Sequence, residues 1–302
     1  MGTPAFAVPA LEVLLAGSDP VVGLFTQPDK AVGRGLKLLA SPVKQVGERQ
    51  GIPLFQPVRL RSEESVAALR ALQPDLVVVV AYGQILSPEV LAIPRQGCLN
   101  VHASLLPRWR GAAPIQRALL AGDELSGVTL MQMESGLDTG PTLSQRSLSL
   151  TDADWTGGML HDRLAQLGAV LLQESLPLLK AGRLSPCVQP VEGVTYAAKL
   201  APQDEQIDWQ HSALQIKRQV LALNPWPAAH TVLNGKLLKI LRCRLGDGAG
   251  GAGQWIARRE DGPEVACGSG SLVLTEVQPA GKRPMAAADW LRGLSVSPAS
   301  FG

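Results

Sequence analysis

With 302 residues and 46% apolar side chains, the chain is longer than most single domains and has enough hydrophobic residues for two cores. Its formal net charge is +2, and no stretch approaches the length of a membrane span, so we expect a soluble protein. The first residues lack the features of a secretory signal and the four cysteines lack metal-ligand spacing, which predicts a cytoplasmic protein with reduced thiols and no metal.

The first 180 residues alternate between two patterns of apolar residues. A helical period predicts helices near 5–16, 43–50, 62–72, 113–121 and 156–181. Short apolar runs predict strands at 21–26, 75–81, 98–102 and 128–133. Because strands that alternate with helices form parallel sheets, we predict an α/β fold with a Rossmann-like, mostly parallel sheet, in a catalytic domain at residues 1–180.

The rest of the chain has a different character. A stretch with Pro, Gly and Gln at 181–206 predicts a linker. One helical pattern follows and leads through an Asn-Pro-Trp-Pro segment into short strands at 230–234, 237–244, 254–258 and 271–277. That spacing favours a small closed β-structure, which we assign to a second domain at residues 207–302.

Residues 99–114, together with 137–140, carry the strongest chemical signal. Side chains two apart on a strand share a face, so Asn100 and His102 point into one pocket at the end of the predicted strand. Transfer of an acyl group to an amine needs an oxyanion donor, a route for the amine's proton and a group that orients the histidine, and Asp138 supplies the third. Taken alone, Asn100 capping a turn beside a structural buried His102 explains the same triplet.

Two segments concentrate positive charge. Residues 30–44 contain four basic residues and no acidic one, around two glycines that favour a flexible loop; an ordinary surface loop has the same composition. Residues 209–259 contain eight basic residues and one acidic residue, a net charge of +7. Several basic residues of the second segment lie on predicted strands, where they can form a positive surface for the RNA backbone. An ordinary solvated basic face has the same sequence pattern.

The longer segment NVHASLLPRWRGAAPIQ at 100–116, followed by MESGLDTGP at 133–141, resembles the signature of the folate-dependent formyltransferases, and within them the members that act on methionyl-tRNA. Further matches follow in order along almost the whole chain, at 2–6, 25–29, 33–35, 41–44, 79–83, 207–209 and 224–227. The resemblance implies the formyltransferase fold, followed by an OB-like barrel.

The resemblance also implies the reaction. The formyl group of 10-formyltetrahydrofolate passes directly to the α-amino group of methionine on initiator tRNA, for the initiation of translation. Asn100 and His102 are then expected to donate hydrogen bonds to the developing oxyanion. Asp138 is expected to raise the basicity of His102 and to receive the amine's proton through water. We expect a monomer with no metal.

Binding residues follow from the same resemblance. The folate is expected between 82–86 and 134–140, at Tyr82, Gly83, Gln84, Leu86, Ser104, Leu105, Leu106, Pro107, Gly136 and Thr139. Phe6 is expected near the methionyl side chain, although core packing is the simpler role for one Phe. The tRNA is expected at Arg34 and Lys37 of the first basic segment and at Lys236, Lys239, Arg242 and Arg244 of the second.

One departure from the family lies at the start of the sequence. Relatives carry an apolar strand before the Gly-Thr-Pro turn, whereas this sequence begins at Met1-Gly2, so we expect unpaired sheet edges there and either an upstream start or a truncated form. Two rival functions remain: a formyltransferase for a sugar nucleotide or glycinamide ribotide, and an RNA-binding protein without activity.

Overall fold

The computed structural model describes residues 1–32, 37–294 and 300–301. Arg34, a predicted tRNA contact, lies outside the described residues, and Lys37 is described only by its backbone. Within the described part, no helix combines the length and apolar character needed to cross a membrane. The chain divides into two compact units: unit 1 is Met1–Pro114, Leu125–Leu148 and His161–Ala197, and unit 2 is Ile115–Glu124, Ser149–Leu160 and Ala198–Gly302.

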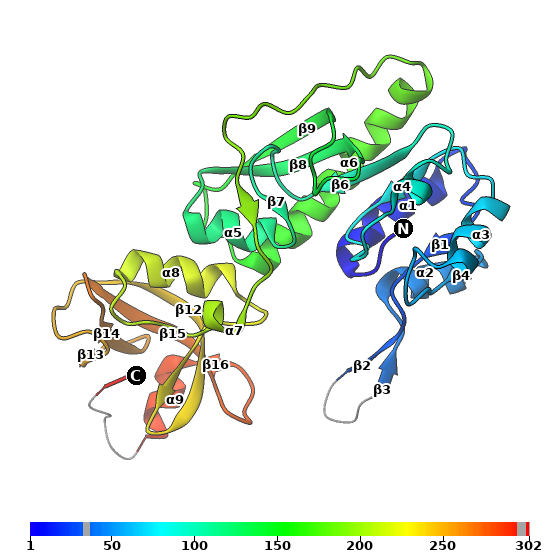
Figure 1. Cartoon of the computed structure of the whole chain (residues 1–302). Helices are drawn as coiled ribbons and strands as arrows, with labels where there is room; N and C mark the ends of the chain where they lie inside the picture. The colour runs from blue at the N-terminus through cyan, green and yellow to red at the C-terminus, as the bar shows by residue number, and fades with distance from the viewer. Residues whose placement is uncertain (33–36, 295–299, 302) are drawn as a thin grey trace. The chain divides into compact units, whose positions relative to one another are not determined.

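Unit 1 is built on a four-stranded sheet with the order β5-β6-β8-β9, of which β6, β8 and β9 are labelled in Figure 1. Its strands are β5 (Val77–Val79), β6 (Cys98–His102), β8 (Leu125–Gln132) and β9 (Thr142–Ser149). The predicted Rossmann-like parallel pairing is confirmed for β5 with β6 and for the separate pair β1 (Leu24–Phe25) and β4 (Leu54–Phe55). Beyond β6 the sheet changes direction, because β8 pairs antiparallel with β6.

The helices predicted for the first 180 residues are present. They are η1 (Ala5–Ala7), α1 (Val8–Ala16), α2 (Pro42–Gln50), α3 (Glu63–Ala71), α5 (Pro114–Ala121) and α6 (Gly157–Lys180), with a short α4 (Pro88–Leu91) in addition. Local sequence explains where two of them begin. The Ser41 hydroxyl accepts a hydrogen bond from the Lys44 backbone at the start of α2, and the Ser62 hydroxyl does the same for Ser65 in α3.

Helix α6 packs closely against β6, the strand that carries the candidate site. Gly168 of α6 faces Val101 of β6, and a Cβ at position 168 would lie only 2.7 Å from Val101 Cγ1. The helix buries Leu164, Leu171 and Leu172 almost completely. Burial of this apolar stripe holds β6 in place from one face of the sheet.

The first two residues connect β1 to β5. The Met1 amino group donates to the Val78 carbonyl over 2.7 Å, and Gly2 N–H donates to the Phe25 carbonyl over 3.0 Å. Beside them lies a groove of about 300 Å³ with a mainly apolar lining that includes Leu24 and Leu176.

Two small strand pairs complete unit 1. An antiparallel hairpin joins β2 (Lys30–Val32) to β3 (Lys37–Leu39) within the first basic segment. A parallel pair joins β7 (Arg110–Gly111) to β10 (Tyr196–Ala197), so part of the stretch at 181–206 pairs with the loop that follows β6.

Unit 2 contains an antiparallel sheet with the order β11-β12-β15-β14-β13, with β16 paired to β15. Its elements are α7 (Pro202–Glu205), α8 (Ala213–Ala222), β11 (His230–Leu233), β12 (Lys236–Gly246), β13 (Trp255–Arg258), β14 (Pro263–Ala266), β15 (Ser271–Pro279), β16 (Met285–Ala286) and α9 (Ala287–Arg292). All four predicted strands are present.

The sheet of unit 2 is open, since β11 and β13 end it on either side and pair with each other nowhere in the described residues. The expected closure into a small barrel is therefore incomplete. Helix α8 and two aromatic rings cover the core instead: Ile216 and Val220 are fully buried in the same cluster as Trp209 and Phe301. The Trp209 and Phe301 rings lie 5.7 Å apart. These side chains bury the apolar face that strand closure would otherwise cover.

Candidate active site

Asn100 and His102 lie at the carboxyl end of β6, two residues apart and therefore on one face of the strand. Strands pair with β6 on both sides: Val79 of β5 and Met131 of β8 lie opposite Asn100. His102 is 6% exposed, whereas Asn100 is half-buried. The two side chains therefore stand on a backbone that is fixed by strand pairing on both sides.

Asp138 reaches this pair from the loop between β8 and β9. Its Oδ1 accepts a hydrogen bond from Asn100 Nδ2 over 3.4 Å, and its Oδ2 lies 3.7 Å from His102 Nδ1. Gly111 N–H donates to the same Oδ2 over 2.8 Å. Asp138 has φ +51°, a left-handed conformation that the surrounding contacts must maintain. The structure thus brings together the amide, the imidazole and the carboxylate singled out from the sequence.

The histidine ring has a second partner. His102 Nε2 lies 2.9 Å from the Trp109 carbonyl oxygen, and because a carbonyl only accepts, Nε2 carries the proton. Asp138 was expected to orient the histidine; in the structure the Trp109 carbonyl fixes the tautomer, and Asp138 faces the other ring nitrogen. In the neutral ring, Nδ1 is then unprotonated and faces Asp138. No sequence signal marks Trp109, since the contact is made by its carbonyl.

The loop after β6 is ordered by polar side chains behind it. The buried Thr129 hydroxyl donates to the Ser104 carbonyl over 2.7 Å and accepts from Leu106 N–H over 3.1 Å. Gln145 Nε2 donates to the Leu106 carbonyl over 2.8 Å, and the Ser104 hydroxyl donates to the Arg108 carbonyl over 2.6 Å. These hydrogen bonds pair the buried backbone N–H and carbonyl groups of the loop and hold the Trp109 carbonyl in position.

The ten predicted folate residues fall into two groups. Five have side chains turned to the protein interior: Tyr82, Gln84, Leu86, Ser104 and Leu106. Burial raises the pKa of Tyr82 to about 12, and its hydroxyl has no hydrogen-bond partner in the described part of the chain. The other five are half-buried or exposed in loops: Gly83, Leu105, Pro107, Gly136 and Thr139. Gly83 and Gly136 therefore expose backbone at these segments, and the half-buried Leu105, Pro107 and Thr139 keep part of their side chains accessible.

Phe6 is 6% exposed and packs edge-on against the His161 ring, with the ring centroids 5.3 Å apart. This position agrees with core packing. Its place beside a methionyl side chain stays a prediction.

Lys44, counted in the first basic segment, is neutralised. Its Nζ lies 2.6 Å from Asp29 Oδ2 and 2.9 Å from Gln56 Oε1. The hydrogen bonds from Lys44 and Gln56 lower the pKa of Asp29. The acidic partner stands one position before the segment in which charge was counted, so the count at 30–44 overstated the free positive charge.

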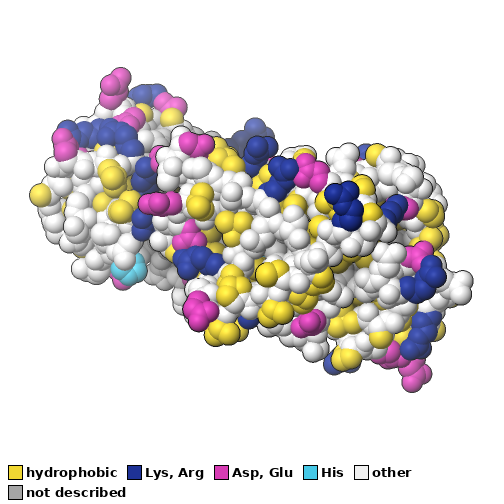
Figure 2. Space-filling view, turned by 90° about the horizontal axis from the view of Figure 1, so that it is seen from above, with side chains coloured by type: hydrophobic (Ala, Val, Ile, Leu, Met, Phe, Trp, Pro, Cys, Tyr) yellow, Lys and Arg dark blue, Asp and Glu magenta, His cyan; other side chains and the backbone are white. Residues whose placement is uncertain are grey.

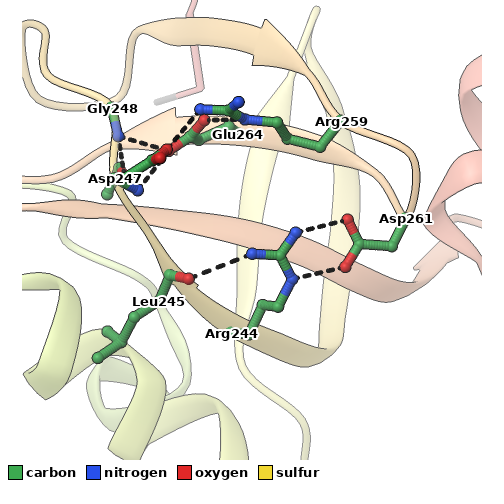
Figure 3. Close-up of polar contacts among 8 residues, drawn as sticks. Arg244, Leu245, Asp247, Gly248, Arg259, Asp261 and Glu264 are labelled. Atoms are coloured by element: carbon green, nitrogen blue, oxygen red, sulfur yellow. Dashed lines mark hydrogen bonds and ion pairs between the residues drawn. The ribbon is translucent and has the colours of Figure 1, made fainter.

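The basic strand β12 also has acidic partners. Arg244 Nε lies 2.6 Å from Asp261 Oδ2 (Figure 3). Arg242 Nε lies 3.5 Å from Glu276 Oε2 on the paired strand β15. On the face drawn in Figure 2, acidic side chains likewise lie among the basic ones. Lys239 Nζ donates to the Pro227 carbonyl, and exposed Lys236 has no acidic partner in the described residues. Ion pairs with acidic residues outside the counted segment therefore neutralise part of its net charge of +7.

Glu264 of β14 anchors the loop that follows β12 (Figure 3). Its fully buried carboxylate accepts hydrogen bonds from Ser271 Oγ over 2.6 Å and Gly248 N–H over 2.7 Å, and Arg259 Nε donates to it over 2.6 Å. Burial alone would raise the pKa of Glu264, but the bonds from Ser271, Gly248 and Arg259 lower it to about 2. The group is therefore charged in the folded protein at neutral pH.

We expect Glu264→Gln to lower the free energy of unfolding at pH 7 by about 3 kcal/mol, because the amide cannot accept all the hydrogen bonds that Ser271, Gly248 and Arg259 donate to the buried carboxylate. The folded pKa of about 2 lies below the unencumbered value of 4.5, so this stabilisation is complete above pH 4.5 and is lost as pH falls toward 2. Denaturant unfolding at pH 7 and pH 3 measures both effects. Exposed Glu260→Gln is the control, and equal stability of the two variants at pH 7 contradicts the prediction.

Comparison with known proteins covers almost the whole chain. The formyl transferase family model matches residues 1–176, and the model of the formyl transferase C-terminal domain matches 199–295. A methionyl-tRNA formyltransferase of Magnetococcus marinus is 57% identical over 98% of this chain and 95% of its own length. One of Methylococcus capsulatus is 51% identical over 100% and 98%. An N-formyltransferase from Helicobacter canadensis, solved with folinic acid and dTDP-3-aminofucose, is 18% identical with a TM-score of 0.67, over 92% of this chain and 97% of that one.

Proposed function

The chain belongs to the formyl transferase family, and we propose that it transfers the formyl group of 10-formyltetrahydrofolate to the α-amino group of methionine on initiator methionyl-tRNA. The observation that carries this proposal is identity of 57% and 51% to two methionyl-tRNA formyltransferases over at least 98% of the chain, its C-terminal part included. The convergence of Asn100, His102 and Asp138 supports it.

The geometry supports a direct transfer. The methionyl amine attacks the formyl carbon, and Asn100 Nδ2 donates a hydrogen bond to the oxygen as it becomes an anion. His102 Nε2 already donates to the Trp109 carbonyl, so the neutral ring has no free N–H for the oxyanion, the role expected from the resemblance. In this proposal His102 Nδ1 instead accepts the proton that the amine loses, in place of the water-mediated transfer expected of Asp138. Asp138 stabilises the resulting imidazolium across 3.7 Å. The bond from the formyl carbon to N10 then breaks, and the proton passes from Nδ1 to N10, so that formyl-methionyl-tRNA and tetrahydrofolate leave.

The substrates are assigned to separate surfaces. We propose the backbone of 82–86 and of 134–140 for the folate, with Phe6 near the methionyl side chain. The tRNA is assigned to the first basic segment, with Arg34 and Lys37, and to a tRNA-binding domain at 207–302 with Lys236, Lys239, Arg242 and Arg244. In this proposal the protein works as a monomer in the cytoplasm, in the initiation of translation, with the folate as its only small-molecule co-substrate.

A sugar nucleotide is the second candidate acceptor, because the Helicobacter canadensis structure shares the fold over 92% of this chain. A competition assay separates the two. The purified chain is mixed with 10-formyltetrahydrofolate, methionyl-tRNA and an amino-sugar nucleotide, with glycinamide ribotide in a parallel reaction, and the formylated products are quantified. Formylation of methionyl-tRNA at least 100-fold above the other acceptors supports the proposal, whereas preference for either small amine overturns it.

Lys236 offers a test of the tRNA surface, because it is exposed at the start of β12 without an acidic partner in the described residues. We expect Lys236→Ala to raise KM for methionyl-tRNA by about threefold to tenfold and to reduce the slope of log KM against log salt by about 1. The KM for the folate should stay unchanged. Lys180→Ala removes a lysine that is ion-paired with Asp19 and serves as control. Equal salt slopes for wild type and Lys236→Ala contradict the assignment.

A further inference from the structure

Gln189 lies in the stretch whose composition predicts a linker, yet it is buried against the site, with 7% exposure. Its Nε2 donates to two backbone carbonyls of the loop between β8 and β9: to Asp138 over 2.8 Å and to Gly140 over 2.7 Å. Both hydrogens of the amide are thus used on the loop that carries the site's carboxylate. Nothing in the local sequence marks this glutamine.

The oxygen of the same amide is also occupied. Arg110 of β7 donates to Gln189 Oε1 through Nε over 3.0 Å and through a terminal guanidinium nitrogen over 2.7 Å. Arg110 is itself 9% exposed. A guanidinium that donates twice to the amide oxygen polarises the amide and strengthens its N–H donors. Arg110, Gln189 and the Asp138 loop therefore form one connected network.

The neighbouring residues of this stretch hold the other half of the site. Thr195 accepts from Trp109 N–H at its hydroxyl over 2.9 Å and from Arg110 N–H at its carbonyl over 2.9 Å. The carbonyl of Trp109 in turn accepts from His102 Nε2. Trp109 has φ +64° and Asp138 has φ +51°, two strained positions that need outside support. Residues 187–197 reach both of them, and we call this segment the brace.

We infer that Gln189 is a positioning residue for formyl transfer: by holding the Asp138 and Gly140 carbonyls it keeps the Asp138 carboxylate beside His102 Nδ1. This inference rests on the proposed function. Gln189 touches neither reacting group, and it acts through the left-handed backbone of Asp138. A displacement of about 1 Å at a reacting group costs on the order of 100-fold in rate. Loss of the brace contact therefore lowers turnover more than it lowers substrate binding.

Two variants test the inference. Gln189→Glu keeps an acceptor for Arg110 and removes both donations to the loop, and Gln189→Leu removes the whole network at similar volume. Both should lower kcat by about 10- to 100-fold, with KM for folate and methionyl-tRNA within about threefold of wild type. In a background of Asp138→Asn, Gln189→Glu should cost less than about threefold further, because the group it positions is already lost.

Hydrogen exchange provides a second test, which does not depend on the substrate that accepts the formyl group. Gly111 N–H is protected by Asp138 Oδ2, so its hydrogen exchange, followed by NMR, should accelerate at least tenfold in Gln189→Glu. Exposed Gln206→Leu is the control for both readouts and for thermal unfolding. Unchanged Gly111 exchange, or a full additive loss in the Asp138→Asn background, overturns the inference. Failure of the wild type to formylate methionyl-tRNA refutes the proposed function instead and leaves the exchange test valid.

Discussion

Replacing Asn100 with alanine is expected to lower kcat by about 100- to 1000-fold, the usual cost of removing one oxyanion donor. The amide stands on β6 between two paired strands, so its removal leaves the backbone in place. The hydrogen bond to the oxygen strengthens only as charge develops there. For that reason kcat and kcat/KM should fall by the same factor, while the KM values stay near those of wild type.

Steady-state kinetics with methionyl-tRNA and 10-formyltetrahydrofolate measure this effect. Asn100→Asp is the matched variant, since it keeps the size of the side chain and lacks the N–H donor, and it should be at least as slow. Thermal unfolding and tetrahydrofolate binding show whether each variant is folded. Turnover of Asn100→Ala within tenfold of wild type, in a folded protein, removes Asn100 from the mechanism.

His102→Gln is expected to lower kcat by about 100- to 10,000-fold, the range for loss of a general base. Glutamine can place its amide nitrogen near the position of Nε2 and so retain the hydrogen bond to the Trp109 carbonyl. It has no group that replaces Nδ1. The variant therefore separates the structural contact from the acceptance of the amine's proton.

The control for this variant is His211→Gln, which changes an exposed histidine of unit 2 that has no assigned role. It should keep wild-type turnover. Single-turnover rates at saturating folate isolate the chemical step from product release. If His102→Gln keeps a tenth or more of the wild-type rate, Nδ1 does not accept the proton and another base must be found.

The elements that sequence patterns predicted well are those with strong apolar periodicity. The buried residues of β6 and the stripe of α6 produce clear signals, and both elements lie where they were expected. Strand β9 was missed because its residues are half-exposed or exposed and mostly polar, so no apolar run marks it. The sequence pattern also could not predict that β8 runs antiparallel to β6, since buried parallel and antiparallel strands have the same apolar runs.

At the candidate active site, prediction from the sequence failed for a different reason. The residue types at 100, 102 and 138, taken with the longer resemblance around them, predicted which groups meet. The triplet alone also allowed a turn cap beside a structural histidine. Trp109 and Gln189 escaped prediction, since one acts through its carbonyl and the other lies 51 residues beyond the aspartate that it contacts. Charge counting failed along β12 for a similar reason, as Asp261 and Glu276 come from outside the counted segment.

The most direct test of the account is the formation of formyl-methionyl-tRNA by the purified chain. The chain is incubated with 10-formyltetrahydrofolate and initiator methionyl-tRNA, and the product is identified by the mass of the released amino acid, for wild type and for Asn100→Ala. The account predicts rapid formylation by wild type and at least 100-fold slower formylation by the variant. Equal rates for the two proteins, or no formylmethionine from folded wild type, would contradict it.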